Sequence, residues 1–202
     1  GAFSFDHAKA LTTGEGGMLT FSNRNLYMRA RAWHDHGHEN NPNLPRGKDN
    51  RIMPGFNYRM TEMQGVIGKV QLSKLDFMIQ ENKKRYQILK NLISEIFDVR
   101  NQLDNQSGSY DTFIFSAEDS NKRDLILDIL KLNKFGTKNL PDAMEWHCSY
   151  FWPHALSSKQ ISDSEKTFNI LQRQIAIPIM LKKNLADYEV LGKNILDQLS
   201  RI

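Results

Sequence analysis

The stretch Phe3 to Met18, FSFDHAKALTTGEGGM, constrains the fold of this chain more than any other. It predicts a short strand over residues 3–5, a polar loop with a single lysine, Lys9, and a glycine turn that leads into a second, apolar strand over 18–21. A lysine on a loop between two strands of an α/β protein is suited to form a Schiff base with a carbonyl group. Because only the neutral amine reacts, such a lysine needs a partly desolvated, electropositive setting.

Hydroxyl groups flank this lysine and could bind a phosphate. Ser4 precedes Lys9 at the end of the first predicted strand, and Thr12 and Thr13 follow it. Taken alone, Lys9 would more often be an ordinary solvated lysine, because exposed lysines are the norm. The functional interpretation therefore depends on the spacing of the whole segment.

That spacing, Ser-Phe-x-x-x-Lys-x-x-Thr-Thr-Gly-Glu-Gly-Gly, resembles the cofactor-lysine segment of the DegT/DnrJ/EryC1/StrS aminotransferases. These enzymes use pyridoxal 5'-phosphate (PLP), act on nucleotide sugars and related carbohydrates, and have the aspartate aminotransferase-like fold type I. With Asp6 after Ser-Phe and the later runs HDHGHENNP, PRGKDNR and GFNYRM, the chain is most similar to the 8-amino-3,8-dideoxy-manno-octulosonate transaminase branch. That branch aminates C8 of a 3-deoxy-octulosonate sugar.

The resemblance implies roles for individual residues. Lys9 would bind PLP, Ser4 would contact its phosphate, and Asn57 of GFNYRM would reach the cofactor phosphate of a neighbouring subunit. The active unit would then be a homodimer with composite sites. In the family the lysine falls near the middle of a longer chain, so we expect this sequence to be the C-terminal half of an enzyme. The glycine-rich phosphate loop, the aromatic residue that stacks on the cofactor ring and the acid that pairs with its nitrogen would then lie outside it.

Composition narrows the class of protein. The chain is 40% hydrophobic and 25% charged, which is ordinary for a globular protein. Its formal charge of +4 is mild, and its basic residues are scattered, so no nucleic-acid partner is implied. A single cysteine, Cys148, excludes an internal disulfide framework and fits a reducing compartment. No apolar run is long enough to cross a membrane and no signal peptide is recognisable, so we expect a cytoplasmic protein without a membrane partner.

We expect an α/β fold in three parts: the end of the PLP-binding large domain over 1–60, a long linking helix over 61–98, and a small C-terminal α/β domain over 99–202. The predicted elements are a helix over 25–32 capped by Asn23, the linking helix capped by Thr61 with a bend between Gln71 and Leu75, strands over 110–116, 134–138 and 175–179, and helices from 119–121 to 133, over 162–172 and over 185–202.

Two further segments could contact a substrate. The polar stretch from His34 to Met53 holds three alternating histidines, a pattern that suggests a metal site if the backbone is extended. No familiar ligand spacing completes it, so we favour a polar loop near a substrate pocket and expect no metal. Arg46 in this loop and Arg59 after it could meet a phosphate or carboxylate.

The second segment is aromatic and contains Trp146 and His147. Aromatic faces stack on the C–H surfaces of sugars, so this segment could form a wall of a sugar site. It could equally be a cluster that packs the domain, and the sequence leaves both alternatives open.

The function that the resemblance implies is transfer of an amino group from an amino acid, expected to be glutamate, to a keto or aldehyde sugar in the biosynthesis of a surface polysaccharide such as lipopolysaccharide. Released Lys9 would act as general base and acid. One alternative is a PLP- or PMP-dependent sugar dehydratase, although known dehydratase relatives replace the lysine with histidine. Another is a non-catalytic scaffold or sensor fragment of the same fold, and as a fragment the chain could lack activity.

Overall fold

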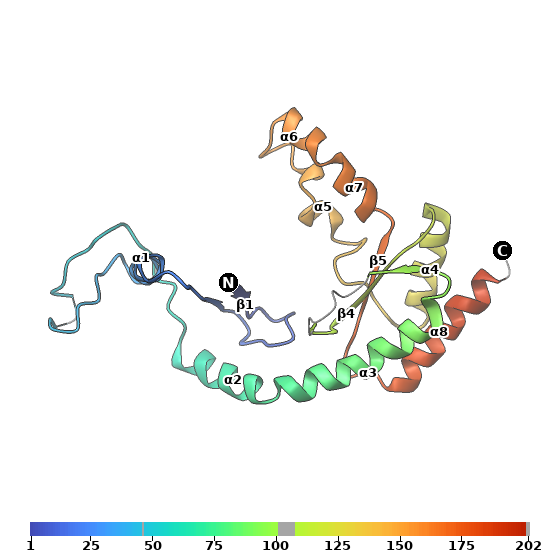
Figure 1. Ribbon diagram of the computed structural model, residues 1–202, viewed down its shortest axis with the longest axis horizontal. Coiled ribbons are helices and arrows are strands. Elements are labelled where there is room, and N and C mark those ends of the chain that lie inside the picture. Colours follow the sequence, from blue (N-terminus) through green and yellow to red (C-terminus); the bar gives the residue numbers. More distant parts are fainter. Residues whose placement is uncertain (46, 101–107, 201–202) are drawn as a thin grey trace. The chain divides into compact units, whose positions relative to one another are not determined.

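A computed structural model of the chain describes residues 1–45, 47–100 and 108–200. The chain divides into two compact units, Gly1–Leu75 and Asp76–Ile202, which are described separately below (Figure 1). The division falls inside the segment 61–98 that we expected to link two domains. No helix in the described part of the chain is long and apolar enough to cross a membrane.

The first unit begins with the predicted pair of strands. β1 (Ala2–Ser4) pairs antiparallel with β2 (Gly17–Leu19), with Phe3 opposite Met18. Both strands are exposed along their length, and a two-stranded sheet is marginal by itself. The loop between them carries Lys9.

Helix α1 (Arg24–His34) follows, and its start is confirmed as predicted. The Asn23 side chain caps it by accepting hydrogen bonds from the backbone N–H groups of Asn25 and Leu26. This satisfies two of the amide groups that a helix leaves without partners at its first turn. Ala32 is its one fully buried residue among those described.

The chain after α1 returns to pair with the end of that helix. Gly37 has φ +80°, and a Cβ there would lie 1.7 Å from the Met53 carbonyl oxygen. Gly55 crosses at the same point, because a Cβ there would lie 2.3 Å from the Gly37 nitrogen. Only glycine allows two backbones to approach this closely. The crossing fixes both ends of the loop between residues 37 and 55.

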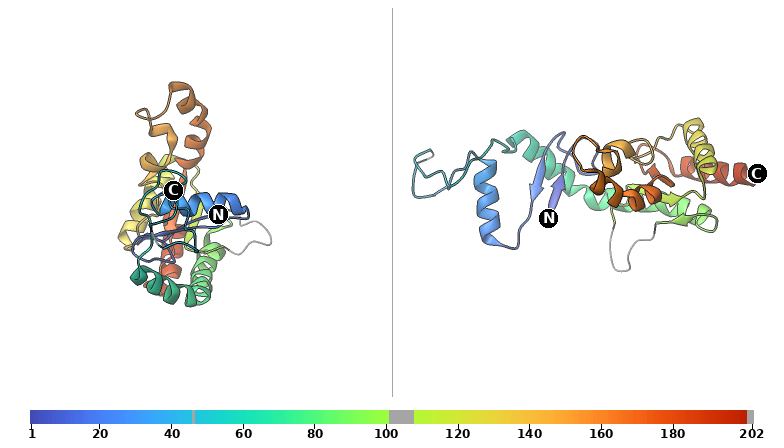
Figure 2. Two further views of the ribbon diagram at one scale, coloured as in Figure 1. Left: turned by 90° about the vertical axis from the view of Figure 1, so that its left-hand side faces the viewer. Right: turned by 90° about the horizontal axis from the view of Figure 1, so that it is seen from above.

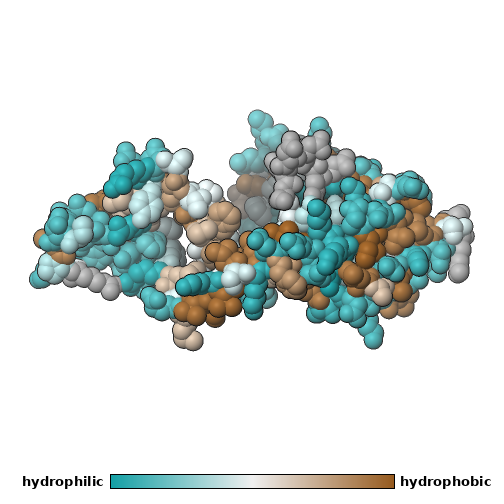
Figure 3. All heavy atoms as spheres, turned by 60° about the horizontal axis from the view of Figure 1, so that its bottom comes forward, coloured by the Kyte–Doolittle hydropathy of each residue, from teal (hydrophilic) through white to brown (hydrophobic). Residues whose placement is uncertain are grey.

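Helix α2 (Glu62–Ser73) completes the first unit and begins with a capping box. The Thr61 side chain accepts from the Gln64 backbone, and the Gln64 side chain accepts from the Thr61 backbone. Helix α3 (Leu75–Ile93) starts after an interruption at Lys74, inside the interval where we expected a bend. Figure 3 shows apolar surface over the part of the chain that includes α2, whose Met63 and Val66 are 78% and 63% exposed.

The second unit is built on an antiparallel sheet in the order β3 (Asp98–Val99), β4 (Thr112–Ser116) and β5 (Gln174–Pro178). Phe113 and Phe115 lie on the same face of β4, toward the core, and both are 0% exposed. Helices α3, α4 (Ser120–Leu132) and α8 (Leu185–Leu199) supply most of the rest of the core. The buried helical side chains include Tyr86, Leu89, Ile93, Ile126, Ile129, Leu130, Tyr188, Leu191 and Ile195.

The predicted strand over 134–138 is wrong. Lys134 takes a positive φ of 57°, which ends α4 in a tight turn. Lys138 then donates one backbone hydrogen bond to the Ala176 carbonyl at 2.8 Å, and Ala176 donates to the Leu140 carbonyl at 3.1 Å. These contacts hold the segment along β5 without a regular ladder. Residues 134–138 therefore lie beside β5 without joining the sheet as a strand.

The predicted helix over 162–172 is also wrong in its bounds. The structure has α6 (Ser158–Asp163), capped by Ser157, and α7 (Glu165–Leu171), with an interruption at Ser164. They lie in the orange part of the chain in Figure 2. Before them come α5 (Met144–His147) and the 3-10 helix η1 (Ser149–Phe151). The Tyr150 ring stacks on that of Phe168 at 4.3 Å, so part of the aromatic segment packs the unit.

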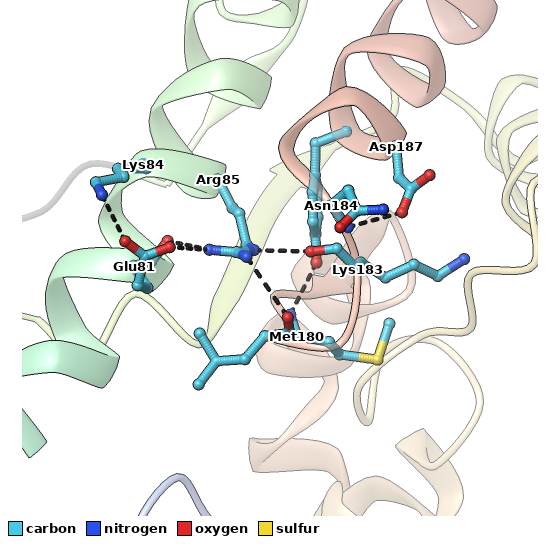
Figure 4. A network of polar contacts seen from close by, with 9 residues as sticks. Glu81, Lys84, Arg85, Met180, Lys183, Asn184 and Asp187 are labelled. Carbon is cyan, nitrogen blue, oxygen red and sulfur yellow. Dashed lines mark hydrogen bonds and ion pairs between the residues drawn. The ribbon is translucent and has the colours of Figure 1, made fainter. Parts of the chain in front are cut away.

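One buried arginine ties α3 to the turn between β5 and α8. Figure 4 shows Arg85 pointing from α3 toward this turn. Its Nε donates to the Lys183 carbonyl at 3.1 Å and its Nη2 to the Leu181 carbonyl at 3.5 Å. Nη1 donates to the carboxylate of Glu81 at 2.9 Å, so the charge is paired. The side chain is 9% exposed.

Candidate functional site

Asp6 organises the turn that carries Lys9. Its carboxylate accepts from the Ala8 N–H at 2.7 Å, and its carbonyl accepts from the Lys9 N–H at 3.1 Å. The Asp6 N–H in turn donates to the Ser4 hydroxyl at 3.4 Å. An aspartate that bonds a backbone amide two residues on is a common way to close a turn. This local geometry brings Ser4 and Lys9 to either side of one carboxylate.

Electrostatics around Lys9 differ from our expectation. The Lys9 side chain is 48% exposed, and its Nζ lies 3.8 Å from the Asp6 carboxylate. The hydrogen bond from the Ala8 backbone lowers the pKa of Asp6 most, and the charges of Lys9 and His7 lower it further. The charged neighbour that the structure describes for Lys9 is therefore an anion. The desolvated, electropositive setting predicted for a reactive amine is not present in the described part of this chain.

The lysine loop is attached to α2. Thr13 is 5% exposed, and its methyl group lies 3.2 Å from where a Cβ on Gly68 would stand. The Gln64 side chain donates to the Glu15 carbonyl at 2.9 Å. Any side chain at residue 68 would press against Thr13, so glycine there lets the loop lie close to the helix. The sequence prediction missed this attachment.

Two hydroxyl groups that we considered as phosphate donors serve the loop instead. Thr12 Oγ1 donates to the Phe5 carbonyl at 3.2 Å, and Thr13 Oγ1 donates to the Glu15 carbonyl at 2.7 Å. The Thr12 hydroxyl also accepts from the Gly14 N–H at 3.0 Å. Both groups shape the turn that carries Lys9.

Asn57 lies in a short antiparallel pairing with the end of α1. Asp35 and Asn57 form an isolated bridge, and the Tyr58 N–H donates to the His34 carbonyl at 2.9 Å. The Arg59 Nε donates to Asn57 Oδ1 at 2.9 Å. The same nitrogen lies 3.4 Å from Asp35 Oδ1, yet this buried oxygen accepts no hydrogen bond among the described residues. Asp35 therefore acts on Arg59 through charge.

The structure thus forms two groups from the predicted site residues. Ser4 and Lys9 meet at Asp6, and Asn57 meets Arg59. No hydrogen bond or ion pair between described residues joins one group to the other. The sequence analysis assigned no role in the site to Asp6 or Asp35, although the position of Asp6 two residues after Ser4 could have indicated the turn.

The other predicted substrate residues lie elsewhere. Arg46 falls outside the described residues. Trp146 and His147 belong to α5 of the second unit, and Trp146 is 81% exposed. Their substrate roles stay predictions.

The loop between residues 37 and 55 is held by hydrogen bonds to the Asp49 carboxylate. His38 Nδ1 lies 2.9 Å from Asp49 Oδ1, and the Asn40 N–H donates to Asp49 Oδ2 at 2.7 Å. Burial raises the pKa of Asp49, but these two hydrogen bonds outweigh it and the net shift is downward. His34, the first of the three alternating histidines, contacts the Arg31 carbonyl through Nδ1 at 2.5 Å, and no hydrogen bond between described residues joins it to Asp49. In the described part of the chain no group of three or more His, Cys, Asp or Glu side chains could hold a metal ion.

Described residues of the first unit line a larger and a smaller hollow. The larger, about 690 Å³, is apolar and is lined by residues that include Phe5, Met18, Trp33 and Tyr58. The smaller, about 240 Å³, has a mixed polar and apolar lining that includes Arg31, His38 and Asp49. Neither is lined by Lys9 or Asn57.

The groups present match part of what a phosphorylated aldehyde cofactor requires. Lys9 offers an amine that is accessible to solvent, Ser4 a hydroxyl on the same turn, and Asn57 an amide whose oxygen is already engaged. These fit the aldehyde and the phosphate. A residue that would stack on the ring, or an acid for its nitrogen, is not identified among the described residues.

The sequence model of the DegT/DnrJ/EryC1/StrS aminotransferase family matches residues 1–194. GDP-perosamine synthase of Caulobacter vibrioides is 40% identical over 74 residues, which are 37% of this chain and 19% of that protein. GDP-perosamine synthase of Escherichia coli O157:H7 is 30% identical over 112 residues, 50% of this chain and 26% of that protein.

Among solved structures, Helicobacter pylori PseC, an aminotransferase involved in the biosynthesis of pseudoaminic acid, superimposes with a TM-score of 0.75 at 18% identity. The superposition covers 100% of this chain and 53% of PseC. The chain therefore spans about half the length of this structure, and at this identity the likeness concerns the fold.

Proposed function

The chain belongs to the DegT/DnrJ/EryC1/StrS aminotransferase family, and from this premise we propose that it carries the cofactor lysine, Lys9, of a PLP-dependent sugar aminotransferase. The fold is that of the fold type I enzymes, and PLP is the cofactor of this family. The observation that carries the proposal is the turn around Asp6, which places the Lys9 amine and the Ser4 hydroxyl together on a loop attached to α2.

In this proposal each group has one task. Lys9 Nζ would hold the cofactor through its aldehyde carbon and, once released, would take the proton from the amine-bearing carbon of the amino donor and deliver it to that former aldehyde carbon. The Ser4 hydroxyl and the Asn57 amide donate hydrogen bonds to the phosphate. PLP, when bound, supplies the electron sink for this proton transfer. The amine must lose its proton to act, so the Asp6 carboxylate has to be offset by cations or by exclusion of water when the site is complete.

Substrates are proposed from the relatives. Two of them are named GDP-perosamine synthases, and PseC acts in the biosynthesis of pseudoaminic acid. We propose a keto or aldehyde sugar as the amino acceptor and glutamate as the donor, in the biosynthesis of a surface polysaccharide. The runs HDHGHENNP and GFNYRM favour an octulosonate sugar.

We further propose that the chain corresponds to the C-terminal half of such an enzyme, because it spans about half the length of PseC. We propose that the enzyme is a cytoplasmic homodimer. Asn57 and Lys9 lie in separate groups, which suits a dimer in which each subunit completes the site of the other. The rest of the cofactor site would come from the remaining polypeptide.

Titration with PLP tests the proposal. The complete protein that contains this chain is titrated, reduced with borohydride and mapped by peptide mass. We expect a visible absorbance band and a trapped adduct on the peptide that contains Lys9. Lys9→Ala should lose both, whereas the matched control Lys69→Ala, at an exposed position of α2, should keep them.

Absence of an adduct in the wild-type protein would overturn the assignment and would favour a scaffold or sensor role for the fold. If the adduct forms and the sugar loses a hydroxyl group without gaining an amino group, the enzyme is a dehydratase. Retention of Lys9 argues against that outcome.

A further inference from the structure

The contact between Arg59 and Asn57 fixes which way the Asn57 amide faces. A guanidinium group has five N–H donors and no acceptor, so the Asn57 atom that it contacts must be the carbonyl oxygen. Arg59 Nε donates to that oxygen at 2.9 Å. The NH₂ group of Asn57 therefore points to the other side, where it can donate to a ligand.

The backbone around Asn57 is held on both sides. The Phe56 N–H donates to the Trp33 carbonyl at 2.8 Å, and the Tyr58 N–H donates to the His34 carbonyl at 2.9 Å. The crossing of Gly37 and Gly55 prevents this segment from sliding along α1. Only the side-chain torsions of Asn57 remain to be set, and Arg59 sets them.

Asp35 controls the charge at this place. Its side chain is 15% exposed, and its Oδ1 lies 3.4 Å from Arg59 Nε without accepting a hydrogen bond. A carboxylate beside an anion-binding amide would repel the anion. Arg59, whose side chain is 35% exposed, offsets that charge while its N–H is directed at Asn57.

We propose that Arg59 is a positioning residue for Asn57: it turns the amide oxygen inward, leaves the NH₂ group to donate to a phosphoryl oxygen, and neutralises Asp35. This inference rests on the proposed function, since the phosphoryl group is that of PLP. It differs from our expectation that Arg59 itself meets the phosphate or carboxylate of a substrate. The two ideas differ in how much the removal of Arg59 weakens PLP binding once Asn57 is gone: less than before if Arg59 positions Asn57, and equally if Arg59 itself contacts a ligand.

A double-mutant cycle distinguishes a positioning role of Arg59 from direct binding of a ligand by Arg59. The dissociation constant of PLP is measured by absorbance titration for the complete protein that contains this chain and for Asn57→Ala, Arg59→Met and the double variant. Loss of the amide donor should raise the constant by about 10- to 100-fold, as expected for a hydrogen bond to a charged group. Arg59→Met should raise it by about 2- to 10-fold. Adding Arg59→Met to Asn57→Ala should change it less than Arg59→Met does alone, because only the uncompensated charge of Asp35 then acts.

Two controls exclude a general loss of structure. Melting temperatures without cofactor should be similar for all four proteins, because Asn57 and Arg59 are exposed. The side-chain NH₂ resonances of Asn57, observed by NMR without PLP, should be dispersed in the wild type and should move toward random-coil values in Arg59→Met. A residue that only binds substrate would leave these resonances unchanged.

Equal effects of Arg59→Met with and without Asn57 would overturn the inference, and a raised KM for the amino donor in that case would assign Arg59 to substrate binding. If the wild-type protein takes up no PLP, the proposed function fails. The Asn57 resonances then decide the positioning role alone: a shift in Arg59→Met supports it, and no shift overturns it.

Discussion

The two units of this chain differ in how much apolar side chain they bury. In the described part of Gly1–Leu75 the one buried apolar residue is Ala32, whereas Asp76–Ile202 holds the whole hydrophobic cluster around Phe113 and Phe115. Ordering a residue costs about 1–2 kcal/mol of backbone entropy, and burial of apolar surface returns about 25 cal/mol per Å². The second unit can offset this cost from its own core, and the first cannot.

The first unit is not poor in apolar residues, because they lie on its surface. Phe3, Leu19 and Val66 are 52%, 58% and 63% exposed. Large exposed apolar areas usually mark places where other polypeptide binds. The unit that carries the candidate site therefore has its geometry set by local hydrogen bonds, and its stability must come from contacts beyond those described.

The largest expected effect comes from separating the units. Fragment 1–75 should be unfolded in isolation, because it lacks a core, whereas fragment 76–202 should fold and unfold cooperatively. Circular dichroism and amide proton dispersion by NMR measure both. A folded 1–75 fragment with a sharp thermal transition would show that local hydrogen bonds are enough to stabilise the first unit, and the two units would then not differ in stability as expected.

Two leucines test the same contrast at the level of one side chain. Leu89 of α3 is 0% exposed, and Leu72 of α2 is 60% exposed. In urea unfolding of the chain, Leu89→Ala should lower the free energy of unfolding by about 2–5 kcal/mol. Leu72→Ala, a substitution of the same chemistry, should change it by less than about 0.5 kcal/mol.

The effect of Leu72→Ala also shows whether other polypeptide covers α2. If Leu72→Ala has a small effect in this chain and a large effect in the complete protein, the exposed face of α2 is covered there. Equal losses for both variants in this chain alone would contradict the difference between the units.

Features that depend on near neighbours could be predicted from the sequence. Asn23 and Thr61 were predicted as helix caps and act as such, and the helix predicted to begin at 119–121 is capped by Asp119. Capping bonds join residues two or three apart, so the sequence contains the information. Alternation of Phe113 and Phe115 is equally local.

Features that depend on contacts between residues far apart in the chain could not be predicted from the sequence. Whether residues 134–138 form a strand depends on β5, which lies some forty residues later in the chain, and the pairing there stops after two hydrogen bonds. The contact of Arg59 and Asn57 beside Asp35 requires the chain to return to the end of α1. The motif indicated Lys9, Ser4 and Asn57, but the residues that contact them, Asp6 and Arg59, are seen only in the fold.

Arg85 allows a buried and an exposed charge to be compared within the second unit, because its side chain is only 9% exposed. Arg85→Met should lower the free energy of unfolding by about 1–3 kcal/mol, since the Leu181 and Lys183 carbonyls lose their donor. Lys84→Met is the matched control: Lys84 pairs with the same Glu81 but is 59% exposed, so its loss should cost about 0–1 kcal/mol. Equal effects in chemical denaturation would mean that burial of Arg85 contributes nothing.

The smallest expected effect is the contribution of Asp111 to the pH dependence of stability. Burial raises the pKa of Asp111, but hydrogen bonds from Lys138 at 2.6 Å and Ser109 at 2.8 Å outweigh it, so the net shift is downward. A carboxyl group whose pKa is lower in the folded state stabilises the fold above its unfolded pKa, about 3.9, and this contribution is lost as the pH falls through the folded pKa.

Asp111→Asn should therefore be less stable than the wild type near pH 7, by at most about 1 kcal/mol, and the difference should narrow below about pH 4. Urea midpoints between about pH 3 and pH 7 measure this. Asp49→Asn is the control in the first unit. The pKa of Asp49 is also lowered, but that unit contributes little to cooperative unfolding, so the midpoint should not move. A pH-independent deficit for Asp111→Asn would assign its effect to the lost hydrogen bonds rather than to charge, and a shifted midpoint for Asp49→Asn would show that the two units unfold together.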